Sequence, residues 1–281
     1  MFRRKRRALA VALVCAVLGA LVVTPVARGQ DLIEYALIVG QLALLTQDTT
    51  PPTIAITTPP EGATYAPGQP VAAEYGCTDA GVDFMTTLAN QLGFPTLNAF
   101  LAFAAANGSN VAPPTCAGPV ASGAPIDTSS PGPHTFTVTA TDVAFTVVGG
   151  TLVAQPNTAT ATTHYTVAYP FGGFQRPIED APASNLVKAG QAVPVKFSLG
   201  GDRGLGILSS APTSHEADCD SGEIGELVPP SPAGSSGLQY DAASDTYTWV
   251  WKTDKTWAGN CRTLTVALDD GTEHTALFMF K

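Results

Sequence analysis

The chain has 281 residues, with 14 Lys and Arg against 23 Asp and Glu. Residues 1–29 hold six of the cations and no acid, so the remainder carries eight cations against twenty-three carboxylates, a net charge of −15. This charge excludes a general affinity for nucleic acid or anionic membrane surfaces, because their phosphates would be repelled. The length after residue 29 suits two modest domains.

The first 29 residues have the pattern of a secretory signal peptide. Five cations at positions 3–7 precede an apolar run from Ala8 to Val23, and small residues follow at Ala27 and Gly29. We therefore expect cleavage between Gly29 and Gln30, and a protein that is secreted or held in the cell envelope. We expect no stable transmembrane anchor once the leader is removed.

Residues 30–47 form an apolar segment without Pro, for which a short helix is predicted. GQDLIEYALIVGQLALL resembles the processing site of small type IV-like (Flp class) pilins, with Gly29 before the cut and Glu34 and Tyr35 after it. The apolar stretch Leu32–Leu45 is shorter than the roughly 20 residues that span a bilayer. Two interpretations stay open: a helix that packs on the next domain or a poorly ordered mature N-terminus on one side, and a pilin-like assembly segment on the other.

Four cysteines follow the leader, and they fall as one pair in each half of the chain. An even cysteine count in an exported protein predicts disulfides, which we assign as Cys77–Cys116 and Cys219–Cys261. A four-thiolate zinc site would need closely spaced Cys-x-x-Cys pairs, and the sequence has none.

Residues 48–169 are rich in Thr, Pro, Gly and Val, which predicts short strands and turns. DTTPPTIAITTPPEGATYAPGQ, YGCTDAG and GAPIDTSSPGPHTFTVTATD resemble the bacterial Ig-like, HYR-like repeats of secreted and surface proteins. The strand spacing, with a disulfide between non-adjacent strands, predicts an Ig-like β-sandwich. Residues 82–115 interrupt it with a predicted helical hairpin, whose Phe100, Leu101 and Phe103 either pack on the sandwich or form an apolar partner-binding surface.

Residues 170–184 are predicted to be a linker, and residues 185–281 a second antiparallel sandwich. Val193, Val195 and Phe197 alternate along one strand, and two hairpins follow, with turns at 242–245 and 270–271. The fold class is therefore all-β, with two tandem antiparallel β-sandwich (Ig-like) domains preceded by a signal peptide and a short apolar helix.

VKAGQAVPVKFSLGGDRGL and YTWVWKTDKTWAGNCRTLTVALDDGTEHTALF resemble the PxKF domain, whose signature is Pro194, Lys196 and Phe197 here. That family occurs at the C-terminal end of exported bacterial proteins, commonly after Ig-like or HYR-like repeats. The resemblance implies an architecture and a compartment, and no activity.

Residues 200–206, GGDRGLG, look like a phosphate-binding loop, but Pro212 follows too soon for the helix that such a loop requires. We expect a turn between strands, with anion binding by Arg203 as the alternative. SHEADCD lacks the second histidine of a helical zinc pair, so a solvated loop is predicted for His215, Glu216, Asp218 and Asp220.

No cofactor is expected, with calcium as the alternative ligand. Carboxylates suit calcium, although the spacing here does not match an EF-hand loop. The candidate ligands fall in two groups: Asp79 and Asp83, and Asp269, Asp270 and Glu273.

Three tryptophans lie within nine residues. Trp249 and Trp251 share a strand face with Tyr247 and are predicted to lie in the core. Trp257 lies in the loop KTDKTWAG, with Lys252 and Lys255 nearby, and is the expected ligand contact. No Gly-x-Ser-x-Gly motif or recognisable catalytic acid pair is present, so no enzyme is expected. We expect a binding or adhesion module that contacts cell-wall or extracellular polysaccharide or another surface protein; the alternatives are a pilin-like filament subunit and a passive spacer.

Overall fold

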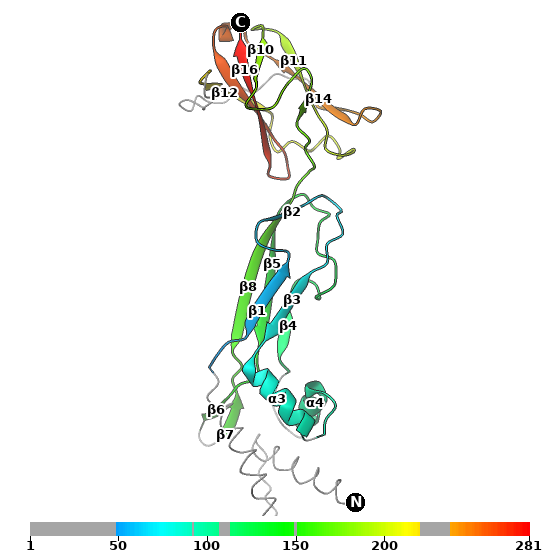
Figure 1. Ribbon diagram of the computed structural model, residues 1–281, viewed down its shortest axis with the longest axis vertical. Helices are drawn as coiled ribbons and strands as arrows, with labels where there is room; N and C mark the ends of the chain where they lie inside the picture. The colour runs from blue at the N-terminus through cyan, green and yellow to red at the C-terminus, as the bar shows by residue number, and fades with distance from the viewer. Residues whose placement is uncertain (1–48, 92, 107–112, 149–150, 220–236) are drawn as a thin grey trace, which may run out of the picture. The chain divides into compact units, whose positions relative to one another are not determined.

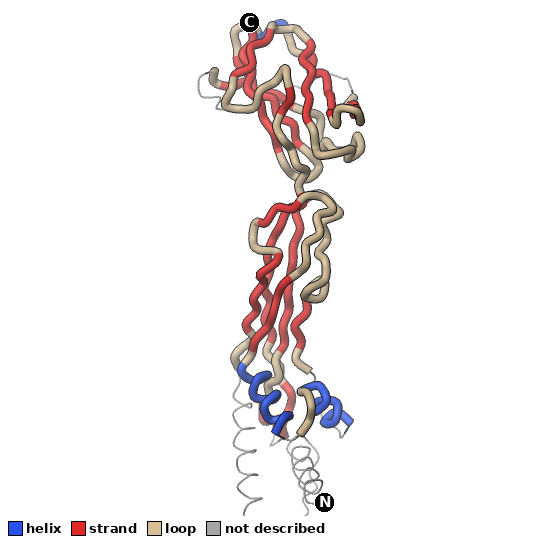
Figure 2. Tube along the Cα trace, turned by 45° about the vertical axis from the view of Figure 1, so that its right-hand side comes forward, coloured by secondary structure: helices blue, strands red, loops and turns tan. Residues whose placement is uncertain are grey.

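The computed structural model describes residues 49–91, 93–106, 113–148, 151–219 and 237–281. The expected leader, its Gly29–Gln30 cleavage site and the segment 30–47 lie outside these residues. The described chain is mostly β-sheet, and its few helical residues belong to α3, α4 and the short η1 (Figure 2). These observations confirm the β-rich fold class.

The chain divides into two compact units. The first contains the described residues up to 60, together with 72–126 and 136–163, and the second contains 61–71, 127–135 and 164–281. Strands that precede residue 168 pair only with one another, and strands that follow residue 173 pair only with one another.

Two sheets form from residues 53–167, and Figure 1 labels their strands. The smaller sheet pairs β1 (Thr53–Thr58) with β3 (Glu74–Thr78), and the larger has the order β2-β8-β5-β4. Its strands are β2 (Ala63–Tyr65), β8 (Thr158–Val167), β5 (Gly132–Thr141) and β4 (Thr115–Ala117). In β5 the buried Phe136, Val138 and Ala140 alternate with threonines, as the two-residue period of a strand requires.

The predicted helical hairpin is present as α3 (Ala80–Gln91) and α4 (Leu97–Ala106). Gly93 follows α3 with φ +81°, a left-handed conformation that favours glycine at a helix end. Phe100 and Leu101 are buried, which supports packing for these two side chains; the side chain of Phe103 lies outside the described part. The hairpin of β6 (Phe145–Val148) and β7 (Thr151–Ala154) precedes β8.

Two four-stranded sheets form from residues 174–280. One has the order β13-β14-β11-β9, with β13 (Gln239–Asp241), β14 (Thr246–Lys252), β11 (Ala192–Phe197) and β9 (Phe174–Gln175). The other has the order β10-β16-β15-β12, with β10 (Ser184–Val187), β16 (Glu273–Phe280), β15 (Cys261–Ala267) and β12 (Thr213–Ala217). Side chains of β11, β14, β15 and β16 form one hydrophobic core between them.

Both predicted hairpins are confirmed, but two edge strands differ from an all-antiparallel arrangement. β2 pairs parallel with β8, and β10 pairs parallel with β16. Each edge strand is separated from its partner by a long stretch of chain, which a parallel pair requires and a tight hairpin cannot supply. The stretch predicted as a linker also holds β9, which pairs with Lys196 and Phe197 of β11.

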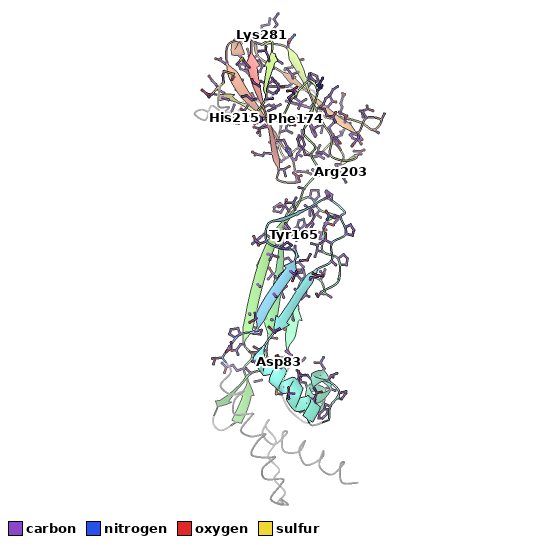
Figure 3. The ribbon with its side chains drawn as sticks, viewed as in Figure 1. Asp83, Tyr165, Phe174, Arg203, His215 and Lys281 are labelled. Atoms are coloured by element: carbon purple, nitrogen blue, oxygen red, sulfur yellow. A yellow bond between two sulfur atoms is a disulfide. The ribbon has the colours of Figure 1, made fainter. Side chains whose placement is uncertain are left out.

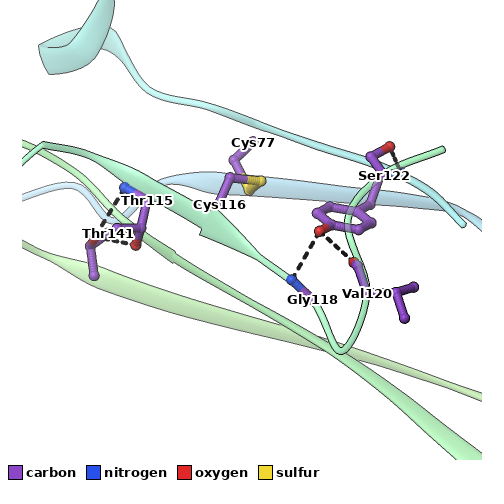
Figure 4. The surroundings of a disulfide bond; sticks show 8 residues. Cys77, Thr115, Cys116, Gly118, Val120, Ser122 and Thr141 are labelled. Atoms are coloured by element: carbon purple, nitrogen blue, oxygen red, sulfur yellow. Dashed lines mark hydrogen bonds between the residues drawn. A yellow bond between two sulfur atoms is a disulfide. The ribbon is translucent and has the colours of Figure 1, made fainter. Parts of the chain in front are cut away.

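Both predicted disulfides are present, Cys77–Cys116 and Cys219–Cys261. Figure 4 shows the first bond, which joins β3 to β4. Tyr75 also belongs to β3: its hydroxyl donates to the Val120 carbonyl at 2.8 Å and accepts from the Gly118 amide at 3.0 Å. Its ring packs 5.9 Å from that of Phe136 on β5. Tyr75 thus fastens the loop after β4 to β3.

Replacing Tyr75 with Phe should destabilise the β-sheets of residues 53–167 by about 1–2 kcal/mol, because the Gly118 amide and the Val120 carbonyl lose a partner while the ring contact with Phe136 remains. The measurement is the urea midpoint of unfolding. Tyr65→Phe is the matched control, since the Tyr65 ring packs at 5.8 Å on Tyr165 and no hydrogen bond of its hydroxyl is seen in the described residues. Equal losses in both variants would contradict the role of the Tyr75 hydroxyl.

Candidate functional site

Trp257 lies on a short loop that backbone and side-chain hydrogen bonds hold in place. The loop turns through η1 (Lys255–Trp257), where Asp254 accepts from the Thr256 amide at 2.8 Å and from its hydroxyl at 2.9 Å. These two hydrogen bonds lower the pKa of Asp254. The loop is closed by the Asn260 amide, which donates to the Trp257 carbonyl at 3.0 Å. Trp257 is therefore presented by an ordered turn.

The ring of Trp257 is half-buried, because it rests on the edge of the second unit's core. Its centroid lies 5.7 Å from that of Trp251 and 5.5 Å from that of Phe280. The guanidinium carbon of Arg262 lies 4.4 Å from the ring centroid, within the range of a cation–π contact. The expected ligand contact is thus partly exposed and fixed from several sides.

Arg262, which supports this ring, is only 6% exposed. Its Nε donates to the Ser214 hydroxyl at 3.3 Å, and one terminal nitrogen donates to the Ser214 carbonyl at 3.0 Å. Burial lowers the pKa of Arg262, and the nearby carboxylate of Glu216, opposite it on β12, acts in the other direction. Among the described residues no carboxylate lies within 4 Å of this guanidinium.

Four exposed lysines lie on the segments around the Trp257 loop. Lys252 ends β14, Lys255 begins η1, Lys188 precedes a turn, and Lys281 follows β16. The segments meet through backbone hydrogen bonds: the Thr253 amide donates to the Gln191 carbonyl, the Gln191 amide to that of Lys188, and the Ala189 amide to that of Lys281. We call Lys188, Lys252, Lys255, Trp257, Arg262 and Lys281 the basic end.

The other two tryptophans fill the core, as predicted. Tyr247, Trp249 and Trp251 of β14 are all buried. The signature residue Phe197 is buried beside them, with its ring stacked 5.5 Å from that of Tyr247. β9 pairs only with Lys196 and Phe197 and stops short of Pro194, which has no N–H to donate to a further strand. The signature therefore has a structural place in β11.

The glycine-rich loop after β11 is a turn that side-chain hydrogen bonds hold in place, and no helix follows it before β12. Asp245 accepts from the Ser198 hydroxyl at 2.7 Å and from the Gly201 amide at 3.0 Å. Arg203, which Figure 3 labels, donates its guanidinium to the carbonyls of Leu199 and Gly200 at 3.3 and 3.0 Å, and its backbone amide donates to the Tyr247 hydroxyl. The guanidinium of Arg203 is thus engaged by the loop's own backbone.

Two of the carboxylates proposed for calcium, those of Asp79 and Asp270, have structural partners. Asp79 caps α3 by accepting from the amides of Gly81 and Val82, and Asp83 lies in the first turn of that helix. Asp270 is fully buried, whereas Asp269 and Glu273 are exposed. Within the described residues, no three His, Cys, Asp or Glu side chains are grouped so as to hold a metal ion.

The segment that contains His215 is a strand, so the prediction of a solvated loop was wrong there. Thr213–Ala217 forms β12, and Ser214 of this strand holds Arg262. Asp218 is exposed after the strand, and Asp220 lies outside the described residues. A strand of only five residues at the edge of a sheet shows too few alternating positions to be distinguished from a loop by its sequence.

A second group of interacting residues, which the sequence pattern did not reveal, surrounds the buried Asp270. Its carboxylate accepts from the Tyr169 amide at 2.7 Å, the Thr272 amide at 2.9 Å and the Thr272 hydroxyl at 2.6 Å. His274 follows, with its ring stacked 3.6 Å from that of Phe171. Burial, helped by a hydrogen bond to Asp269, raises the pKa of Tyr169 to about 12. This group fixes residues 169–171 to the β15–β16 turn.

No protein-family model matches the chain, and no curated protein matches it. In the part of the chain that the structure describes, none of the helices is long and apolar enough to cross a membrane. Function is therefore inferred from the surface around Trp257.

Acidification should weaken the second unit through His274. Burial lowers the pKa of His274 below its ordinary 6.5, and the charges of Asp270 and Asp180 offset this only in part. As the pH falls through about 6.5, the unfolded chain takes up this proton first, so stability is lost toward lower pH. The urea midpoint should fall between about pH 7.5 and pH 5.5 in the native protein, and less in His274→Phe, which keeps the ring stack. An equal fall in both would contradict the assignment.

Proposed function

We propose that this protein is an exported, non-catalytic binding protein that contacts cell-wall or extracellular polysaccharide through the surface around Trp257. The observation that carries the proposal is the half-buried Trp257 ring, held by Trp251, Phe280 and Arg262 on a short hydrogen-bonded loop.

An aromatic ring offers a flat apolar surface to the C–H faces of a sugar ring, while neighbouring polar groups bind its hydroxyls. Binding is strengthened when the ring is already held in its bound position, because less side-chain entropy is then lost. The packing of Trp257 on the core and the closure of its loop by Asn260 meet this requirement. Lys252 and Lys255 precede it on the same exposed segment and offer hydrogen-bond donors.

The proposed compartment and architecture agree with this role. The leader-like residues 1–29 and the two disulfides favour export to an oxidising compartment. The sheets that enclose the second unit's core, and the pair β1–β3 facing the larger sheet through Tyr75 and Phe136, suit two Ig-like sandwiches of the HYR-like and PxKF kinds. Such a protein acts by adhesion, and the proposal assigns no enzymatic step to it.

Trp257→Ala should weaken binding to insoluble cell-wall polymers by about tenfold, because one aromatic stacking contact, worth about 1.4 kcal/mol, is lost. The measurement is co-sedimentation of the purified full chain over a range of polymer concentrations. Trp257→Phe keeps a ring at this position and should retain most of the binding.

Leu205→Ala is the control, since Leu205 is 59% exposed on the corner after β11 and lies outside the Trp257 loop. Binding should be saturable and unchanged by removal of calcium. Absence of binding, or an equal loss in Leu205→Ala, would contradict the proposal and favour the passive spacer.

A further inference from the structure

The cations of this chain are distributed unevenly. Eight Lys and Arg follow residue 29, and five of them belong to the basic end. Among the described residues, three acids lie on the same segments: Asp254 in the Trp257 loop, and Glu216 and Asp218 at the end of β12. Five cations against these three carboxylates give the described part of this end a positive charge, although residues 30–281 carry −15 as a whole.

Contacts between separate segments bring these cations together. Thr253 binds the Gln191 carbonyl through its amide at 3.2 Å and its hydroxyl at 2.6 Å, which joins the Trp257 loop to the turn after Lys188. The side chain of Lys255 crosses this turn: a Cβ at Gly190, whose φ is +83°, would lie 2.5 Å from the Lys255 Cγ. Glycine at position 190 therefore leaves room for the lysine stem.

Arg262 adds a positive charge beneath the aromatic ring. Its guanidinium is hydrogen-bonded by Ser214 and covered by Trp257, and no carboxylate in the described residues pairs with it at 4 Å or less. A buried cation whose described carboxylate neighbours, such as Glu216, lie beyond 4 Å keeps part of its positive potential, because surrounding protein screens it less than water does. Arg262 acts as a positioning residue, since it is too buried to contact a polymer.

We propose that the basic end selects anionic glycans, with a sugar ring on Trp257 and the acidic groups of the chain on Lys252, Lys255 and Lys188. This inference rests on the proposed polysaccharide binding and adds the charge of the ligand. The carboxylates of uronic acids and the sulfates of sulfated sugars supply the same chemistry. Nucleic acid fits less well, because its dense phosphate charge would also be repelled by the acidic remainder of the chain.

The test compares polymers that share one backbone: dextran, carboxymethyl-dextran and dextran sulfate, with duplex DNA as a fourth probe. Affinities of the full chain are measured at about 0.1 M and about 1 M NaCl, between which the Debye length falls from about 10 Å to about 3 Å. At least one charged dextran should bind about tenfold more tightly than dextran at low salt and lose this advantage at high salt. The comparison of carboxymethyl-dextran with dextran sulfate shows whether the surface prefers carboxylate or sulfate groups.

Lys252→Gln/Lys255→Gln should weaken binding of the charged dextran by about tenfold, since each exposed charge pair contributes up to a few-fold. Arg176→Gln/Lys196→Gln is the matched control with the same change in net charge. Lys196 lies four residues along β11 from Ala192, the partner of Lys252, or roughly 13 Å away at 3.3 Å per residue. This control should bind as the native protein does.

Equal binding of dextran and both charged forms, or an equal loss in the control variant, would overturn the inference. Duplex DNA bound as tightly as the charged dextran would also overturn it, because the surface would then be a general polyanion site. If Trp257→Ala still reduces sedimentation with cell-wall polymers in any of these cases, polysaccharide binding stands while its charge selectivity fails. If no polymer binds, both fail.

Discussion

The contact between the Arg262 guanidinium and the Trp257 ring is the interaction on which the candidate site depends. It joins three parts of the second unit, because Arg262 belongs to β15, binds Ser214 of β12 and supports the Trp257 loop. Phe280 and Trp251 hold the same ring from the core. A desolvated cation under an aromatic ring is more strongly attracted than an exposed one, so burial of Arg262 favours a fixed position of the tryptophan.

Several polar side chains that look like candidate ligands in the sequence form hydrogen bonds with the protein's own backbone in the structure. Asp79 caps α3, and Asp245 accepts a hydrogen bond from the loop after β11. Asp270 accepts from the β15–β16 turn, and Arg203 donates to a carbonyl of its own loop. Loops between short strands leave many amides and carbonyls without ladder partners, and buried groups of this kind must be paired. Polar residues in loops are therefore weaker evidence of a binding site here than a partly exposed aromatic ring.

Features set by local patterns were predictable from the sequence. Alternation placed Phe136 and Val138 in the core, and turn residues marked the hairpins that flank Asp245 and Gly271. Long-range pairing was not predictable, because the parallel partners of β2 and β10 lie about a hundred residues away along the chain. For the site, the loop position of Trp257 predicted that it would be a ligand contact. Arg262 lies in a stretch with a strand pattern, and no local pattern predicted that its guanidinium would contact the Trp257 ring.

The most direct test of the central claim is an NMR titration that follows the indole N–H signals of the three tryptophans as soluble glycan is added. Trp249 and Trp251 are buried, so of the three tryptophans only the half-buried Trp257 can contact a polymer. We predict that the Trp257 signal shifts saturably while the other two move little. A glycan that binds with no change at Trp257 would contradict the account.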